Sequence, residues 1–103
     1  MNDDDIRETN IINIDNLNII TNGSLQDLNK ISNPNQVGQV IYKDNSEVKS
    51  DINPMIMIIN QGLEDYKERL KILVKNGGDL DMKINYYNIE TTPRILAKEY
   101  RNY

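Results

Sequence analysis

Hydrophobic and polar positions along the middle of the chain repeat at helical spacing. From residue 63 to 76 the apolar side chains recur mostly every three or four positions, and lysines and glutamates occupy most of the others, a pattern typical of a helix with one buried face. The run Met55–Ile59 is apolar throughout, which indicates a helix covered on every side. It follows Asn53, a good N-cap residue, and Pro54, which suits the first helical position. We therefore predict helices over 54–61 and 63–76.

Weaker helical patterns lie on both sides of these two helices. Apolar positions from residue 11 to residue 22 lean towards helical spacing, with Asp15 as the N-cap. Ser24 and Asp27 have the spacing of a capping box, which predicts a further short helix. Thr92–Pro93 repeats the pair of a capping residue and a proline, and predicts a last helix.

A chain of 103 residues is expected to form one small domain. Residues 1–10 are polar and acidic, so we expect a flexible acidic N-terminal tail followed by a single domain over 11–103. Residues 33–52 hold several turn signals but no clear helix, with one short extended piece at 39–42. A loop of that length inside a small domain is either functional or disordered, and the sequence leaves both open.

Two landmarks recur at the same interval along the chain. Asn53–Pro54 and Thr92–Pro93 lie 39 residues apart, and so do Asn22–Gly23 and Gln61–Gly62. Equal offsets between independent landmarks indicate an internal repeat. Each copy would consist of a helix, a tight turn that a glycine permits, and a second helix.

The residues between these landmarks resemble ankyrin repeats. The stretch Leu70–Asp81 looks like the end of one such repeat, and Thr92–Ala97 looks like the start of the next. Asn53–Ile59 is similar to another repeat opening, with asparagine in place of threonine. The interval of 39 residues exceeds the spacing of about 33 that the family usually shows.

This resemblance implies an all-α fold, namely a short ankyrin-like stack of antiparallel helix pairs joined by long connecting loops. Repeat one would span about 14–50, repeat two about 53–91, and a partial third repeat 92–103. The resemblance also implies a non-catalytic protein that binds a partner protein through its loop tips and the exposed ends of its first helices.

Composition narrows the chemistry that the chain can perform. The sequence has no cysteine and no histidine, which removes thiol and histidine catalysis and most transition-metal ligation. Its formal net charge of −4 argues against nucleic acid as a partner, and no stretch is long and apolar enough for a membrane span. We expect no metal, no cofactor and no enzymatic activity. We expect a cytoplasmic protein. Its many Asn and Ile residues use AT-rich codons, which indicates an AT-rich genome. If that genome is viral, we expect the protein in the cytoplasm of the host cell.

The best candidate site is the tyrosine-bearing loop over 82–90, which would project from the stack. Tyrosine is favoured at interfaces because it gives a large contact area at a low entropic cost, although one of the two adjacent tyrosines could equally pack back on the stack. The loop and the ends of the first helices together provide nine candidate partner-binding residues: Lys83, Asn85, Tyr86, Tyr87, Asn88, Asn60, Gln61, Lys98 and Glu99.

Other polar and sulfur-containing groups have simpler explanations. The run Asp3–Asp5 lacks the spacing of a calcium loop and lies in the expected tail. Asp79 suits a turn that it organises through its own side chain. Met55 and Met57 suit core packing better than an adaptable binding surface.

A second hypothesis is a structural subunit or tether in a larger assembly, such as a virus particle. The stack would also have an open C-terminal face with apolar surface near Ile95 and Leu96. We expect such a face to favour self-association or a covering partner. Tyr100 and Tyr103 could bind a partner or simply cover this face, and both interpretations stay open.

Overall fold

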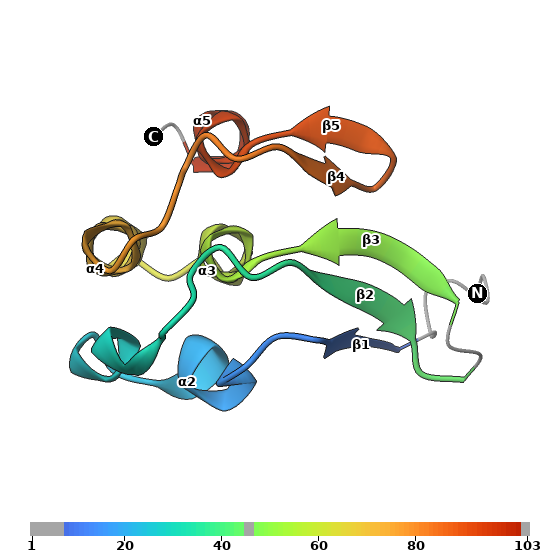
Figure 1. Ribbon diagram of the computed structural model, residues 1–103. Coiled ribbons are helices and arrows are strands. Elements are labelled where there is room, and N and C mark those ends of the chain that lie inside the picture. Colours follow the sequence, from blue (N-terminus) through green and yellow to red (C-terminus); the bar gives the residue numbers. More distant parts are fainter. Residues whose placement is uncertain (1–7, 45–46, 102–103) are drawn as a thin grey trace.

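The protein has a mixed α/β fold of three stacked units (Figure 1). The computed structural model describes residues 8–44 and 47–101. Helices account for 41% and strands for 22% of this part of the chain, so the expected all-α class is wrong. Antiparallel strands occupy the segments where long connecting loops were expected. Their backbone groups are hydrogen-bonded within two separate sheets.

Each unit runs from one or two strands into a first helix, and two of the units continue into a second helix. The first unit contains β1 (Thr9–Ile12), α2 (Leu17–Asn22) and the 3₁₀ helix η1 (Gln26–Lys30). The second unit contains β2 (Gly38–Tyr42), β3 (Val48–Ile52), α3 (Pro54–Gln61) and α4 (Tyr66–Lys75). The third unit contains β4 (Ile84–Tyr86), β5 (Ile89–Thr91) and α5 (Pro93–Arg101).

Equivalent elements lie above one another in the stack. The first helices α2, α3 and α5 form one column, with α3 in contact with both others, and η1 and α4 form a second column (Figure 1). The strands form the third column, in which β3 contacts β4 without joining the two sheets into one. Residues 39 positions apart hold equivalent places, because Asn53 and Thr92 cap first helices and Asn22 and Gln61 end them.

Residues 33–52, which the sequence left unexplained, contain most of the larger sheet. Strand β2 pairs antiparallel with β1 on one side and with β3 on the other. Gly38 lies where an added Cβ would meet the carbonyl oxygen of Ile12, so the absence of a side chain allows β1 to come close. Thr9 and Asn10, expected in the flexible tail, pair with β2. Residues 1–7 of the expected tail lie outside the described residues, whereas Glu8 pairs with Lys43 at 3.1 Å.

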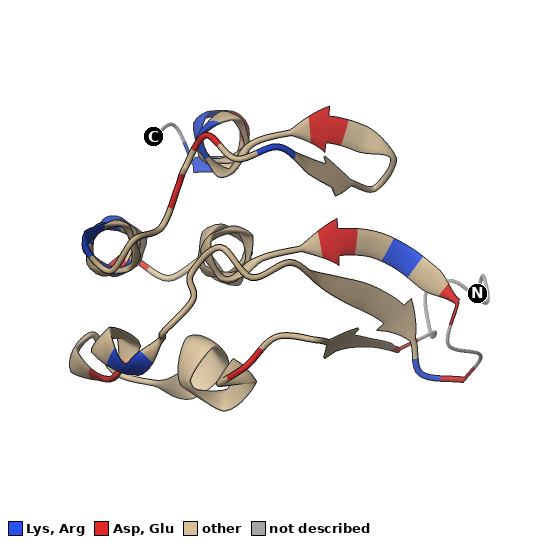
Figure 2. Cartoon of the chain, viewed as in Figure 1, with Lys and Arg blue, Asp and Glu red and all other residues tan. Residues whose placement is uncertain are grey.

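Helix α3 lies at the centre of the core and carries no charged residue (Figure 2). Its residues from Pro54 to Ile59 are all buried, which confirms the prediction of a helix covered on every side. Met55 and Met57 belong to this core, as expected. Of the two apolar residues expected on the open face of α5, Leu96 is buried and Ile95 is 46% exposed.

The capping hydrogen bonds predicted from the sequence are present at the starts of three helices. The Asn53 side chain accepts a hydrogen bond from the Ile56 N–H at 2.8 Å, and Thr92 accepts one from the Ile95 N–H at 3.2 Å, as predicted. Ser24 and Asp27 form the predicted reciprocal box, although it opens a 3₁₀ helix. The helical spacing read from residue 11 was wrong at its start, because residues 11–12 lie in β1. The N-cap of α2 is Asn16 and not the predicted Asp15. Helix α4 begins at Tyr66, three residues after the predicted start.

None of the helices in residues 8–44 and 47–101 combines the length and the apolar content that crossing a bilayer requires.

Replacing Asn53 with alanine is expected to destabilise the fold by about 1–2 kcal/mol, because the buried Ile56 N–H loses its capping acceptor. Urea denaturation followed by circular dichroism measures this loss. Asn53→Ser should lose less, because serine retains a capping oxygen. Asn10→Ala, on an exposed strand position, is the control. Equal stability of the Asn53→Ala variant and the wild type would contradict this role for the cap.

Asp81 provides a pH-dependent contact between the loop after α4 and the start of α5. Its carboxylate accepts a hydrogen bond from Arg94 Nε at 2.8 Å, and this bond holds the pKa of Asp81 below its ordinary value. A lowered folded-state pKa stabilises the fold above the unfolded pKa, and that contribution is lost as the pH falls through the folded pKa.

An NMR titration of the Asp81 carboxyl carbon should therefore give a pKa below that of an unperturbed aspartate. In Arg94→Gln the pKa should return towards the ordinary value. An unchanged Asp81 titration in this variant would show that the arginine is not the cause.

Candidate functional site

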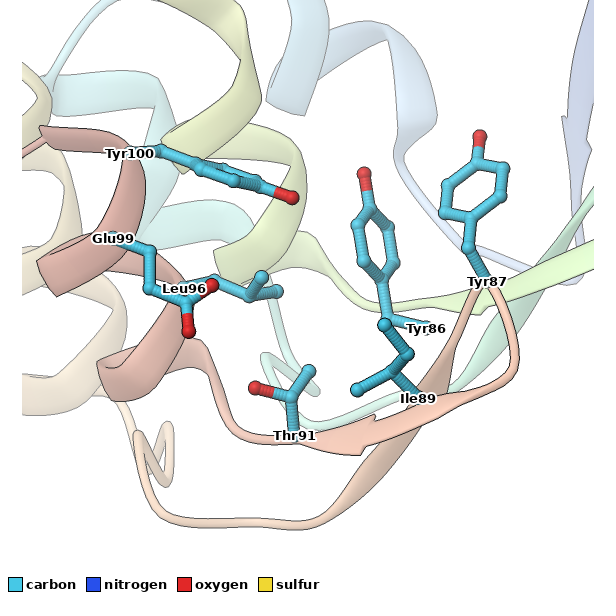
Figure 3. A pocket seen from close by; sticks show the side chains of 7 residues that line it. All are labelled: Tyr86, Tyr87, Ile89, Thr91, Leu96, Glu99 and Tyr100. Atoms are coloured by element: carbon cyan, nitrogen blue, oxygen red, sulfur yellow. The ribbon is translucent and has the colours of Figure 1, made fainter.

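The candidate site is a tyrosine-lined depression on the side of the molecule where the strands meet the first helices. An open cavity of about 490 Å³ lies between α5 and the β4–β5 hairpin (Figure 3), and it is lined by Tyr86, Tyr87, Ile89, Thr91, Leu96, Glu99 and Tyr100. A second depression of about 260 Å³ adjoins it and is lined by residues of β1, β2, β3, α2 and α3. Tyr86 and Tyr87 line both depressions. We call the two depressions together the tyrosine groove.

Tyr86 stands at the boundary between the two depressions and is firmly held. Its hydroxyl accepts a hydrogen bond of 2.7 Å from Asn60 Nδ2, at the end of α3. Its ring meets the ring of Tyr87 edge to face, with the centroids 4.6 Å apart and the planes at 90°. Partial burial raises the pKa of the Tyr86 phenol, so this hydroxyl stays protonated at physiological pH.

Tyr87 occupies a backbone position that tyrosine rarely adopts. Tyr87 and Asn88 are the two central residues of the β4–β5 turn, with φ values of 49° and 67°. Two positive φ angles define a type I′ hairpin turn, in which asparagine and glycine are preferred and a bulky side chain is strained. The Tyr87 N–H donates to the buried Ser50 hydroxyl of β3 at 2.9 Å, which helps to hold the turn in this conformation.

Such strain at a residue that lines two depressions is typical of a functional position. Residue Tyr87 is 39% exposed. Lys49 Nζ of β3 lies 5.5 Å from its centroid, within the range of a cation–π contact. The tyrosine is therefore partly exposed to solvent in a turn where asparagine or glycine would be less strained.

Within the described part of the chain, the lining of the groove is almost uncharged. Glu99 of α5 carries the one formal charge among the residues that line the two depressions. The elements β1, β2, α2, α3 and β4, which bound much of the groove, contain no charged residue at all (Figure 2). The surface thus offers apolar and aromatic contact area, hydroxyl and amide groups, and a single carboxylate.

The structure brings together five of the nine candidate residues named from the sequence and separates the others. Tyr86, Tyr87, Asn60, Gln61 and Glu99 all line the tyrosine groove. The other four lie elsewhere. Asn85 and Asn88 line a small depression of about 90 Å³ beside β3. Lys83 pairs with Glu90 at 3.7 Å, and Lys98 acts electrostatically on Asp81.

Sequence reasoning missed the part of the lining that the sheets contribute. Ile89 and Thr91 of β5, and Val40 and Ile52 of the larger sheet, were not candidates. Their alternation with polar neighbours could have indicated strands, but the segments are only three to five residues long. Tyr100 was considered, with a role at the open face as the alternative, and the structure places it in the groove.

One buried acceptor lies at the edge of the groove. Gln61 Nε2 donates to the carbonyl oxygen of Ile20 at 2.9 Å, which fixes the orientation of the amide. Gln61 Oε1 is buried and has no hydrogen-bond partner among the residues that the structure describes. The acidic run Asp3–Asp5 lies outside these residues. Across residues 8–44 and 47–101, no three acidic side chains come close enough together to hold a metal ion.

Comparisons with known proteins add no relative. No protein-family model matches the chain, and neither does any curated protein or solved structure. They therefore lend no support to the resemblance to ankyrin repeats, which stays a prediction.

The strained turn can be tested with a matched pair of substitutions. Tyr87→Asn relieves the positive-φ strain but loses the ring contacts, whereas Tyr87→Val loses the contacts and keeps a side chain that is disfavoured at this φ. We expect the valine variant to be less stable than the asparagine variant by about 1–2 kcal/mol. Urea denaturation measures the difference, and equal stabilities would contradict the type I′ turn.

Proposed function

We propose that the chain is a non-catalytic protein-binding module whose tyrosine groove takes a segment of a partner protein. The observation that carries this proposal is the pair Tyr86 and Tyr87, which lines both depressions and is held in place by Asn60 and Ser50. Rigid, partly exposed tyrosines in the middle of a contact surface are favoured anchors of protein interfaces.

The shape and polarity of the groove support a protein segment as its occupant. The two adjoining depressions run from the sheet and α3 to α5, so an extended segment could place successive side chains in them. Thr21, Asn60 and Gln61 add hydroxyl and amide groups to an otherwise apolar and aromatic lining. The single carboxylate, Glu99, gives a nucleic-acid phosphate nothing to pair with.

The absence of catalysis and a cytoplasmic location belong to the same proposal. The lining holds one carboxylate and several neutral phenols, without an adjacent nucleophile and base of the kind that acyl or phosphoryl transfer requires. A chain without cysteine loses nothing under the reducing conditions of the cytoplasm.

The test is affinity capture of a partner from cells of the source organism, followed by measurement of the dissociation constant with the purified partner. We expect the double variant Tyr86→Ala/Tyr87→Asn to weaken binding by at least about 2 kcal/mol, or roughly 30-fold, because it removes both anchors. Asparagine is chosen at position 87 because it suits the turn.

The matched control is Lys83→Ala/Asn85→Ala, which changes the same hairpin outside the groove and should bind as the wild type does. Circular dichroism confirms that each variant is folded. Equal binding by the groove variant would remove the groove from the interface. Capture of one fixed assembly by both forms would instead favour a structural subunit.

A further inference from the structure

The larger depression of the groove combines three aromatic rings with one carboxylate. Tyr86 and Tyr87 come from the β4–β5 hairpin, and Tyr100 comes from α5 on the opposite side (Figure 3). Glu99 lies beside Tyr100 in the sequence and also lines the depression. The two elements thus face each other across the depression with rings on both sides.

The rings are arranged as walls around a partly apolar floor. The rings of Tyr86 and Tyr87 meet edge to face with their centroids 4.6 Å apart, so together they form one continuous aromatic wall on the hairpin side. Tyr100 is 57% exposed, with its hydroxyl directed towards the hairpin in Figure 3. The buried residues Leu96 and Thr91 lie between the two sides of the depression. Aromatic walls of this kind suit a rounded cation, because each ring face carries negative electrostatic potential.

The molecule already contains two cation–π contacts of this kind beside the groove. Lys49 Nζ lies 5.0 Å from the ring centroid of Tyr42 and 5.5 Å from that of Tyr87. Lys49 lines the small depression beside β3 and not the larger depression of the groove. A ligand cation would therefore be expected near Tyr86, Tyr100 and Glu99, away from this lysine.

Charge favours a cation at both short and long range. Glu99 is the charged residue of the lining, and the chain as a whole carries a formal net charge of −4. A primary ammonium has three N–H donors that need partners once it leaves water, whereas a trimethylammonium has none. A depression that offers ring faces and one carboxylate can therefore bind the trimethylammonium without leaving an N–H donor unpaired.

We propose that the depression between α5 and the β4–β5 hairpin binds the side chain of a methylated lysine on the partner protein, with the trimethylated form preferred. This inference rests on the proposed function, because it assigns one side chain of the bound segment to one part of the groove. Tyr86 and Tyr100 flank the ammonium group, Tyr87 supports the Tyr86 ring from the side away from Tyr100, and Glu99 neutralises the charge.

The test compares three synthetic peptides that are identical except for one side chain. The first carries trimethyllysine, the second unmodified lysine, and the third a neutral isostere in which carbon replaces the quaternary nitrogen. Binding is followed by NMR, through the ring resonances of the tyrosines, and by calorimetry. We expect the ring resonances of Tyr86 and Tyr100 to shift, and the neutral isostere to bind at least about fivefold more weakly than the trimethyllysine peptide.

Variants separate the contributions of the rings and of the carboxylate. Tyr100→Ala should weaken binding of the trimethyllysine peptide at least about fivefold, while Tyr100→Phe keeps the ring and most of the affinity. Glu99→Gln should weaken binding of the cation but not of the neutral isostere. Glu90→Gln is the matched control, because it removes the same charge from a carboxylate outside the depression.

Three results would overturn the inference: no shift with any peptide, unchanged binding in the Tyr100→Ala variant, or equal binding of the cationic and neutral peptides. The proposed function would survive each of them if partner capture still depended on Tyr86 and Tyr87. Conversely, tight trimethyllysine binding together with unchanged partner capture in the groove variant would separate the cation site from the partner interface.

Discussion

The structure depends on the burial of α3, a helix without a polar face. Six consecutive residues, Pro54–Ile59, are removed from water, and this requires neighbours on every side. The first helices α2 and α5 pack against α3 from opposite sides, and α4 packs against a third side (Figure 1). A stack with α3 in its middle layer satisfies this demand, and removing either outer unit would expose part of the helix.

The same helix couples the core to the groove. Strand β3 ends at Ile52, and α3 begins at Pro54 after one capping residue, so hardly any flexible connection separates the sheet from the core. The third unit repeats this arrangement at Thr91 and Pro93. Proline has a fixed φ and no N–H, so the sheet ladder cannot continue through either position. The angle between strands and first helix is thereby fixed in both units, and the groove lies in that angle.

The parts of the fold that the sequence predicted correctly are those with short-range causes. Asn53, Thr92 and the pair Ser24 and Asp27 act on backbone groups three residues away, so their roles can be inferred without the tertiary structure. The pairing of β1 with β2 joins residues far apart in the sequence, and the β4–β5 turn has Tyr87 where the usual Asn-Gly signal would have a small residue. The tyrosine pair and Glu99 could be inferred from side-chain chemistry, whereas Ile89 and Thr91 required the strand geometry.

Tyr87 shows why the residue preferences of type I′ turns do not predict the β4–β5 hairpin. Asparagine at residue 87 would make the turn easier, yet the chain has a tyrosine there and holds it with Ser50 and Lys49 from the neighbouring unit. The hairpin is therefore fixed by contacts with β3 as well as by its own turn. Those contacts place the Tyr87 ring against Tyr86, on the side away from α5, so the strained turn also fixes the aromatic wall that the hairpin contributes to the groove.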